Sequence, residues 1–272
     1  MNILISVDIE GVAGVYHPQQ TRAGNPEYER ARRWMTDEAN AAIAGAFEGG
    51  ATTVYVNDSH GDFRNLLPDA LDPRAQVVQG KPRYLGMAAG VELDVEGMCM
   101  VGYHSRAQGA GILAHTINSF AFAGVALNGQ VLGEAGLYGA LAGEHGVPVI
   151  MASGDDVFIG ENRALFPHAT FVQTKRATGQ TSGVSMSPSK ACEAIRAGVM
   201  DAMGALGQAQ PFVIKAPLTV TLQTQTPALA DLFCQWPDFE RRGGCELAFA
   251  APSVAAAVRM LNSCSAMSAL LR

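Results

Sequence analysis

Short apolar runs alternate with segments of helical periodicity along the first half of the chain. Residues 3–7 form a short, mostly apolar run rich in β-branched side chains and closed by Asp8, which is typical of a buried parallel strand. Apolar residues then recur at helical spacing from Pro26 to a glycine pair at 49–50, and residues 52–56 form a second β-branched run. This order predicts a right-handed βαβ unit with two parallel strands.

Two further apolar runs, 98–103 and 147–152, extend the predicted parallel sheet, and we expect a helix between them over 131–145. That helix is rich in small residues, and its first turn contains Glu134. The pattern therefore predicts an α/β fold, in which helices cover both faces of a mostly parallel sheet to give three α/β/α layers.

The pattern changes after about residue 160. From there we expect strand 170–174, helix 188–206, strands 217–224 and 245–250, and a final helix from about Pro252. Apolar and polar residues alternate over 217–224, as in a sheet with one exposed face. We therefore predict two domains: an α/β domain over residues 1–160 that carries the functional site, and a smaller two-layer α+β domain over 161–272.

Composition and charge narrow the classes of function. The chain has 272 residues, of which 48% are hydrophobic and 16% charged, so it contains ample material for the packed core of a soluble protein. Its formal net charge of -6 provides no basic field that would attract phosphate backbones or anionic lipid. We therefore expect neither a nucleic acid nor a membrane as a partner.

The spacing of the cysteines and the composition of the first ten residues indicate where in the cell the protein is located. Five cysteines lie far apart in the sequence and none falls in a C-x-x-C spacing, which argues against a disulfide framework and against a thiolate zinc site. Residues 1–10 contain neither the basic segment nor the cleavage site of a secretory signal, and their apolar run is too short to span a membrane. We therefore expect a cytoplasmic protein.

Polar residues follow the predicted strands at the points where the strands end. Asp8 and Glu10 follow the first strand, His60 follows the second, and His104 follows the third. In open α/β sheets the functional crevice lies outside the carboxyl ends of the strands, so we expect these side chains on one rim. Each signal alone is weak. Acidic pairs often cap turns, and single histidines in loops usually have no function. A glutamate at a helix start, such as Glu134, is also stabilised by the helix dipole.

The combination of these residues points to a metal site. Asp8 and Glu10 lie two residues apart and share a side, and a cation between them would remove their mutual repulsion. Histidine and carboxylate ligands without cysteine suit a catalytic zinc or manganese better than a structural zinc. Five ligands exceed the needs of one tetrahedral zinc, whereas two metal ions can share a bridging carboxylate, for which we favour Asp8. The expected metal ligands are Asp8, Glu10, His60, His104 and Glu134.

The remaining candidates have simpler interpretations. His17, His145 and His168 are expected on the surface, and the pair Asp155-Asp156 is expected to cap a helix. The sequence has no Walker loop, Rossmann glycine fingerprint, H-E-x-x-H helix or G-x-S-x-G elbow. The commonest nucleotide-binding, zincin and serine-hydrolase classes are therefore excluded.

A long, ordered set of motifs covers most of the first 190 residues. It comprises S-V-D-I-E-G-V-A-G at 6–14, Y-E-R-A-R at 28–32, M-T-D-E-A-N at 35–40, V-N-D-S-H at 56–60, G-Y-H-S-R at 102–106, H-T at 115–116, G-E-A-G-L at 133–137, P-V-I-M-A-S-G-D-D at 148–156 and S-P-S-K-A at 187–191. In these motifs the chain resembles the DppA-type zinc-dependent D-aminopeptidases. The region after about residue 200 carries no comparable motif.

The resemblance implies roles for individual residues. The metal ligands of that family lie at the acidic pair, the two strand-end histidines and the later glutamate, and each of these positions is occupied here by one of the five expected ligands. The proposed catalytic histidine of the family corresponds to His115. The resemblance thus implies a binuclear zinc aminopeptidase that releases an N-terminal D-amino acid, such as D-Ala, from short peptides and assembles as a ring-shaped decamer.

Several points of mechanism stay open at this stage. A metal-activated water would attack the peptide carbonyl, and His115 could serve as a nucleophile or, as we slightly prefer, as an acid and base. Arg106, beside His104, is a hypothetical binding residue for the carboxylate of a dipeptide. The alternatives are a binuclear hydrolase of another amide or of a phosphoester, and a noncatalytic dipeptide-binding protein, because the ligand set identifies Lewis-acid chemistry better than it identifies a substrate.

Overall fold

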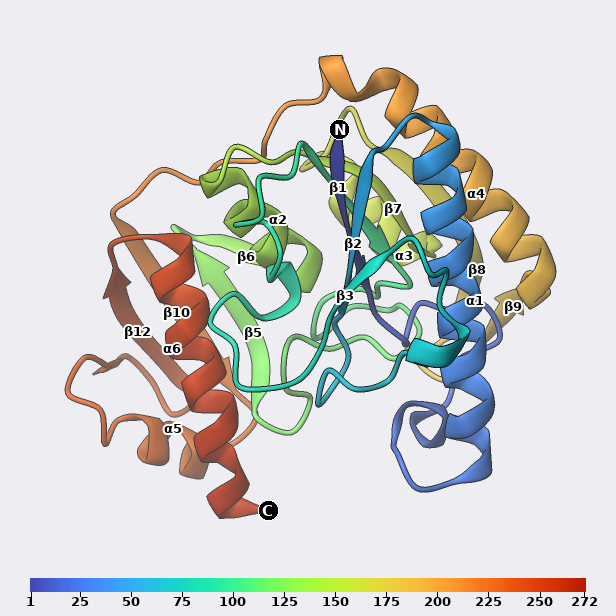
Figure 1. Cartoon of the computed structure of the whole chain (residues 1–272). Coiled ribbons are helices and arrows are strands. Elements are labelled where there is room, and N and C mark those ends of the chain that lie inside the picture. Colours follow the sequence, from blue (N-terminus) through green and yellow to red (C-terminus); the bar gives the residue numbers. More distant parts are fainter.

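The computed structural model describes all residues from Met1 to Arg272 and contains two β-sheets (Figure 1). The larger sheet has seven strands in the order β3-β2-β1-β4-β7-β8-β9. All neighbouring strands in it are parallel except for the hairpin between β8 and β9. Its strands are β1 (Asn2–Val7), β2 (Thr53–Asp58), β3 (Gln76–Val78), β4 (Gly97–Val101), β7 (Val149–Asp155), β8 (Thr170–Gly179) and β9 (Ser182–Ser185).

The second sheet has five strands in the order β11-β12-β10-β5-β6, and all of its pairs are antiparallel. Two of its strands come from the first half of the chain and three from the second half. The strands are β5 (Phe122–Leu127), β6 (Gln130–Leu132), β10 (Leu218–Thr224), β11 (Glu240–Arg241) and β12 (Glu246–Ala251).

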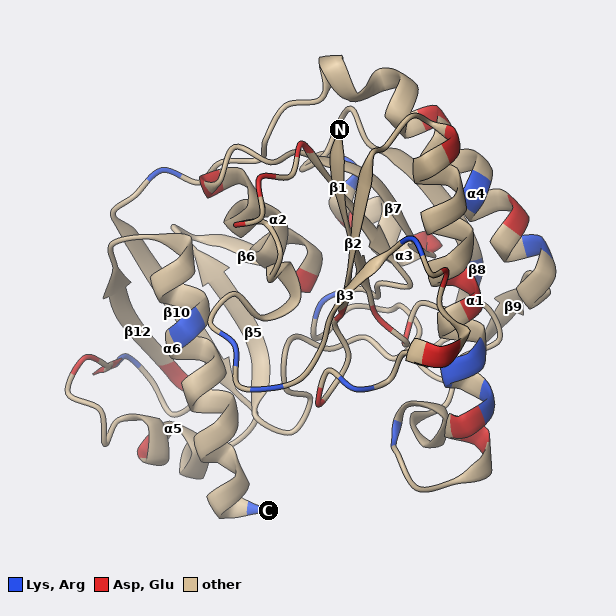
Figure 2. Ribbon diagram, in the orientation of Figure 1, with Lys and Arg blue, Asp and Glu red and all other residues tan.

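Helices cover the sheets in layers. The helices α1 and α4 lie side by side on one face of the parallel sheet, α2 lies between the two sheets, and α6 packs on the antiparallel sheet (Figure 1). Charged residues of both signs are dense along α1 and α4 (Figure 2). The helices are α1 (Pro26–Glu48), α2 (Glu134–Glu144), α3 (Asp156–Asn162), α4 (Pro188–Ala205), α5 (Pro227–Phe233) and α6 (Val254–Met267), with short 3-10 turns at Pro18–Thr21, Pro68–Ala70, Gly86–Ala88, Leu206–Gln208 and Ser268–Leu271.

The longest helix, α1, has clear start and stop signals. The side chain of Asn25 accepts hydrogen bonds from the backbone amides of Glu27 and Tyr28, and Pro26 occupies the first turn, where its missing N–H costs nothing. The helix ends before Gly49, and Gly50 has a φ of +97°, a conformation that favours glycine. These local signals fix the length of the crossover that brings β2 beside β1.

The strand β1 separates two hydrophobic clusters. Ile3, Ile5 and Val7 face the cluster beneath α1 and α4, whereas Leu4 faces the cluster shared with α2 and the antiparallel sheet. Successive side chains of a strand point to opposite faces, so a strand buried on both faces needs a continuous apolar run. The central position of β1 places the residues that follow it, including Asp8, in the middle of the sheet edge.

The architecture confirms the predicted α/β fold with a second, smaller β layer. Two details differ from the sequence-based expectations. Residues 131–132, expected in a helix, belong to β6, and α2 begins only at Glu134. The expected domain boundary at residue 160 does not coincide with the division between the sheets, because β8, β9 and α4 belong with the parallel sheet whereas β5 and β6 pair in the antiparallel one. Strand pairing between distant segments leaves no local signal at a boundary.

The segment Val254–Leu271 is long and apolar enough to cross a membrane by length and composition. In the structure, however, its residues Val254, Ala257, Val258, Leu261 and Cys264 are buried at helical spacing in the cluster that also contains β10 and β12. This spacing is that of an amphipathic helix that covers a sheet.

Candidate metal centre

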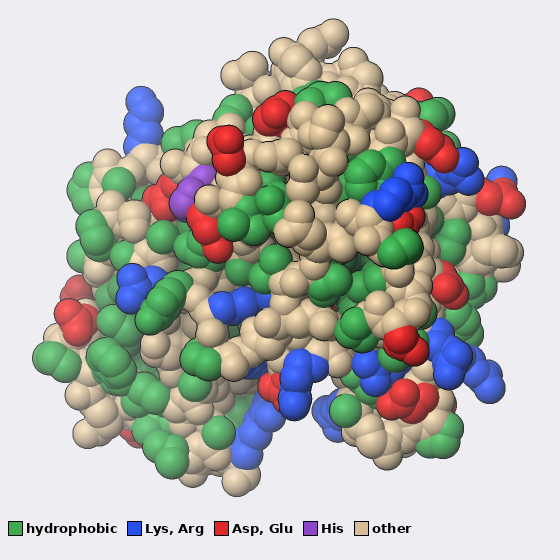
Figure 3. Space-filling model, in the orientation of Figure 1, with side chains coloured by type: hydrophobic (Ala, Val, Ile, Leu, Met, Phe, Trp, Pro, Cys, Tyr) green, Lys and Arg blue, Asp and Glu red, His purple; other side chains and the backbone are tan.

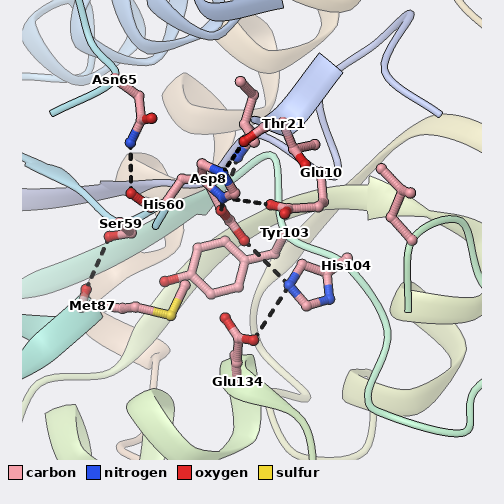
Figure 4. Close-up of polar contacts among 12 residues, drawn as sticks. Asp8, Glu10, Thr21, Ser59, His60, Asn65, Met87, Tyr103, His104 and Glu134 are labelled. Carbon is pink, nitrogen blue, oxygen red and sulfur yellow. Dashed lines mark hydrogen bonds and ion pairs between the residues drawn. The ribbon is translucent and has the colours of Figure 1, made fainter. Parts of the chain in front are cut away.

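The five expected ligands meet at the carboxyl edge of the parallel sheet (Figure 4). His60 Nδ1 lies 3.3 Å from Asp8 Oδ1 and 3.0 Å from Glu10 Oε2. His104 Nε2 lies 3.3 Å from Asp8 Oδ2 and 3.5 Å from Glu134 Oε1. Three ligands follow the neighbouring strands β1 and β2, His104 follows β4, and Glu134 begins α2. The convergence expected from the strand ends is therefore present, and Asp8 lies at its centre.

Main-chain carbonyls fix the orientation of each imidazole. His60 Nε2 is 2.8 Å from the carbonyl oxygen of Thr21, and His104 Nδ1 is 2.9 Å from that of Ser105. A carbonyl can only accept, so in each ring that nitrogen carries the proton and the other presents a lone pair. The lone pairs point at the carboxylates, as in histidines that bind a metal through one nitrogen and donate through the other.

This arrangement leaves buried polar atoms without partners. Asp8 Oδ2, Glu10 Oε2 and His104 Nε2 are buried and have no hydrogen-bond partner. Burial of such atoms without compensation is costly, and lone pairs that face carboxylates repel them. A cation among these atoms would satisfy all of them, so the residues present fit a metal ion with mixed nitrogen and oxygen ligands.

The ring nitrogens that would bind a metal can also bind protons. Burial would raise the pKa of Asp8, but once His104 and His60 are protonated on the facing nitrogens, their hydrogen bonds and charges outweigh burial and hold that pKa well below its usual range. Burial also opposes charge on the two histidines, but Glu10, Glu134 and Asp8 together raise the pKa of both well above the usual value. Protons and metal therefore compete for these ring nitrogens, as expected of a histidine ligand set.

His115 lies beside the cluster. Its ring stacks on that of His104, with 4.1 Å between the ring centroids and 9° between the planes. Its Nδ1 is 2.9 Å from the carbonyl oxygen of Leu113, and its Nε2 is 3.6 Å from Glu134 Oε1. Ligand atoms of His104, His115 and Glu134 lie within 4.8 Å of one another, as do those of Asp8, Glu10 and His104. In this position His115 could transfer a proton at the site, and it could also bind a metal ion.

The cluster lies on the wall of a large cavity of about 1300 Å³. Residues from α6 and from the end of the chain, among them Asn262 and Arg272, also line this cavity. The space-filling view shows a hollow at the lower edge of this face, around which Lys and Arg side chains gather (Figure 3). The cavity is large enough for a short peptide.

Comparison with known proteins agrees with this site. The sequence model of the D-aminopeptidase family Peptidase_M55 matches residues 1–263. The chain belongs to this D-aminopeptidase family. The D-aminopeptidase of Bacillus subtilis (strain 168) is 36% identical over 191 residues, which cover 70% of this chain and 69% of that protein. The solved structure of the Zn-dependent D-aminopeptidase DppA from Bacillus subtilis, described as a self-compartmentalizing protease, matches with a TM-score of 0.95 at 28% identity over 99% of this chain and 98% of that chain.

In this family member, two glycines allow the ligand loops to approach closely. A Cβ atom on Gly11 would lie 2.0 Å from the carbonyl oxygen of Tyr103, and one on Gly102 would lie 2.3 Å from that of Asp8. Gly102 also has a φ of +69°. The loops after β1 and β4 therefore pack backbone against backbone, which brings Asp8 within reach of His104.

Asp58, the last residue of β2, supports the segment beside the site. Its carboxylate accepts from the backbone amides of Asn65 and Leu66 and from the side chains of Asn65 and Gln79, and it does not contact the His60 ring. It therefore orders the loop that follows His60. The orientation of His60 depends instead on the carbonyl of Thr21.

The other sequence-based interpretations have mixed outcomes. His17, His145 and His168 are exposed, and Asp155 caps α3 by accepting from the amide of Phe158, as predicted. Arg106 does not line the cavity. Its Nε lies 3.6 Å from Glu161 Oε1, so its charge is already paired and the suggested role in substrate binding is not supported.

Sequence reasoning missed the residues that support the centre from behind. The carbonyls of Thr21, Ser105 and Leu113 orient the histidines, but a main-chain acceptor has no sequence signal. The buried Lys175 donates through Nζ to the carbonyl oxygens of Glu10 and Val15, at 2.5 and 2.6 Å. A lysine directly after the expected strand 170–174, within β8, was the available signal for such a role, because buried lysines are rare unless they have partners.

Glu38 of α1 is a buried carboxyl near Lys175, and we expect it to make stability depend on pH. Its Oε1 accepts from the amide of Ala13 at 2.8 Å, whereas its Oε2 is buried without a partner. Burial raises its pKa from 4.5 to about 7, against the opposing effects of Ala13 and Lys175. Between these two values the folded state holds a proton that the unfolded state releases, so the contribution of Glu38 to stability falls as pH rises through this window.

Glu38→Gln should therefore become more stable than the original chain as pH rises. The two proteins should be similar near pH 4.5 and diverge up to pH 7 by on the order of 2 kcal/mol in the free energy of unfolding. Urea unfolding of both proteins at several pH values measures this difference, and the effects of the other titrating groups cancel in it. A difference that does not change with pH would show that Glu38 is ionised in the folded state throughout this range.

Proposed function

We propose that this chain is a zinc-dependent D-aminopeptidase that removes an N-terminal D-amino acid, such as D-alanine, from short peptides. The observation that carries the proposal is the set of buried Asp8, Glu10 and His104 atoms that have no protein partner and face one another at the cavity wall. Such a set suits a metal hydrolase, and the chain lies in the D-aminopeptidase family. The zinc dependence of the Bacillus subtilis protein supports zinc as the metal.

We further propose two zinc ions in each subunit, with manganese as the alternative metal. The two carboxylate oxygens of Asp8 face different histidines, Oδ1 facing His60 and Oδ2 facing His104. Asp8 would therefore help to hold both metal ions, Glu10 and His60 would help to hold one of them, and His104 and Glu134 would help to hold the other. A bridging carboxylate with terminal ligands on each side is typical of two-metal hydrolases.

When bound, the metal supplies Lewis-acid polarisation of the scissile carbonyl and activation of a water. The chain supplies proton transfer. In His115 the proton on Nδ1 is held by the carbonyl of Leu113, so Nε2 is free to accept a proton from the water and to return it to the leaving amine. The ring stacked against His104 fixes the position of Nε2 at the cavity wall.

The metal and the stereochemistry can be tested in one assay. We expect the chelated protein to release no amino acid from D-Ala-D-Ala, and added zinc to restore the release. The zinc-loaded protein should cleave D-Ala-D-Ala much faster than L-Ala-L-Ala, because the chirality at the first residue decides which groups face the ligands. Free alanine is measured by chromatography. Equal cleavage of both dipeptides, or cleavage that chelation leaves unchanged, would contradict the proposal.

We also propose a cytoplasmic, ring-shaped decamer that encloses its active sites. The description of the Bacillus subtilis relative as self-compartmentalizing supports an assembly of this kind. The five cysteines are all free thiols, which suits a reducing compartment. Static light scattering of the native particle tests the number of subunits.

A further inference from the structure

Arg83 lines the same cavity as the metal cluster, on the segment between β3 and the turn at Gly86–Ala88. Its guanidinium lies over the ring of Phe63, 3.7 Å from the ring centroid. One terminal nitrogen donates to the carbonyl oxygen of Val78 at 3.2 Å and the other donates to that of Asp58. Asp58 lies two residues before His60, so Arg83 is held against the strand end that carries a metal ligand. Its position in the cavity wall is thus fixed from three sides.

The charge of Arg83 has no counter-ion in the protein. No carboxylate oxygen lies within 4.0 Å of its guanidinium, whereas seven other arginines of the chain form such a pair. Asp58 has the strongest electrostatic attraction to Arg83 among the acidic residues. Its carboxylate, however, already accepts four hydrogen bonds from Asn65, Leu66 and Gln79. Arg83 Nε is also buried and has no hydrogen-bond partner.

The other cations of the cavity differ from Arg83. Lys81 is exposed and lies 3.4 Å from Asp62. Arg22 and Arg272 are exposed to solvent, where water and salt screen their charges. Burial lowers the pKa of Arg83 only to about 10, so it stays charged at neutral pH. A half-buried guanidinium without a carboxylate is costly, and a bound anion would remove that cost.

The cavity therefore has acidic groups at one place and an unpaired cation at another. A short peptide with both termini free carries an amino group, which as the free amine can bind a metal held by these acidic groups, and a carboxylate, which matches the cation. We propose that Arg83 binds the C-terminal carboxylate of the peptide substrate and thereby selects short peptides with a free C-terminus. The proposal rests on the aminopeptidase function proposed above. The planar fork of N–H donors in arginine suits a carboxylate, which can accept two parallel hydrogen bonds from it.

The test compares D-Ala-D-Ala with its C-terminal amide, D-Ala-D-Ala-NH₂, on the same zinc-loaded protein. The original chain should prefer the free acid in kcat/KM, mainly through a lower KM. Arg83→Gln should reduce kcat/KM for the free acid by about 30-fold or more, the usual cost of removing one partner of a hydrogen-bonded charge pair. The same variant should change kcat/KM for the amide by less than about 3-fold. Because both values come from one sample, a partly folded variant does not distort their ratio.

Arg83→Lys and Arg272→Gln complete the experiment. Arg83→Lys keeps the charge but loses the fork, so it should recover part of the preference for the free acid. Arg272→Gln removes an exposed charge from the same cavity and should leave the ratio unchanged within about 3-fold.

Two results would overturn the proposal while leaving the aminopeptidase function intact. One is a wild-type enzyme that cleaves the acid and the amide equally well. The other is an Arg83→Gln variant that loses activity equally on both substrates, which would make Arg83 a structural clamp between Asp58 and Val78. Failure of the wild-type enzyme to cleave either substrate would instead contradict the proposed function.

Discussion

Asp8→Ala should lose the metal and almost all peptidase activity. The two carboxylate oxygens of Asp8 face His60 and His104 at 3.3 Å each, so this side chain is common to both halves of the centre. Loss of a supporting contact to a metal ligand already weakens metal binding by about 10- to 100-fold, so loss of the shared ligand should weaken it by more than about 100-fold. Metal analysis after dialysis measures the loss directly.

Thermal unfolding gives a second readout that does not depend on activity. Zinc should raise the Tm of the original chain, because it binds the folded state only, and it should not raise the Tm of Asp8→Ala. Asp62 provides a matched control, because it is an exposed carboxylate in the wall of the same cavity. Asp62→Ala should retain both the metal and the zinc-dependent rise in Tm. If Asp8→Ala binds zinc as well as this control does, Asp8 is not a ligand.

His115→Ala should retain the metal and lose most of its turnover. His115 stacks on His104 and presents Nε2 at the cavity wall, while its other nitrogen is bound to the carbonyl of Leu113. Loss of a general acid and base typically lowers kcat by about 10²- to 10⁴-fold, and we expect a decrease in that range with little change in KM. Steady-state kinetics on D-Ala-D-Ala, together with metal analysis of the same sample, measure both quantities.

The metal content of His115→Ala distinguishes two roles for this residue. Ligand atoms of His115, His104 and Glu134 lie within 4.8 Å of one another, so His115 is also capable of ligation. Loss of one metal ion from the variant would assign it to the metal centre. Normal turnover with the metal bound would remove His115 from the mechanism. His145→Ala, which changes an exposed histidine at the opposite end of α2 from Glu134, is the control for nonspecific effects.

Much of the parallel sheet could be predicted from local patterns. The apolar runs at β1, β2, β4 and β7 and the caps of α1 and α4 are encoded in contiguous residues, and they agree with the structure within a few positions. The short strands β3, β5, β6, β9 and β11 were missed. They are two to six residues long, and several are exposed or partly exposed, so their periodicity is too weak to detect.

The convergence of most candidate ligands could also be predicted from the sequence. Asp8, His60 and His104 each follow an apolar strand, and the carboxyl ends of parallel strands share one edge. Glu134 is different, because it begins a helix that lies between the sheets, and only packing brings it to 3.5 Å from His104. It joined the candidate set as a carboxylate in the first turn of a predicted helix, and the family resemblance then matched it to a ligand position and His115 to the catalytic histidine.

The sequence by itself determined the elements of the sheet, the residue types available as ligands and the rim on which most of them lie. Only the tertiary structure decided which nitrogen of each histidine faces the carboxylates, which acidic atoms lack partners, and that the charge of Arg83 is unpaired. The physical reason is that hydrophobic periodicity is a property of neighbouring residues. Hydrogen bonds to main-chain carbonyls and missing counter-ions depend on where distant segments come together.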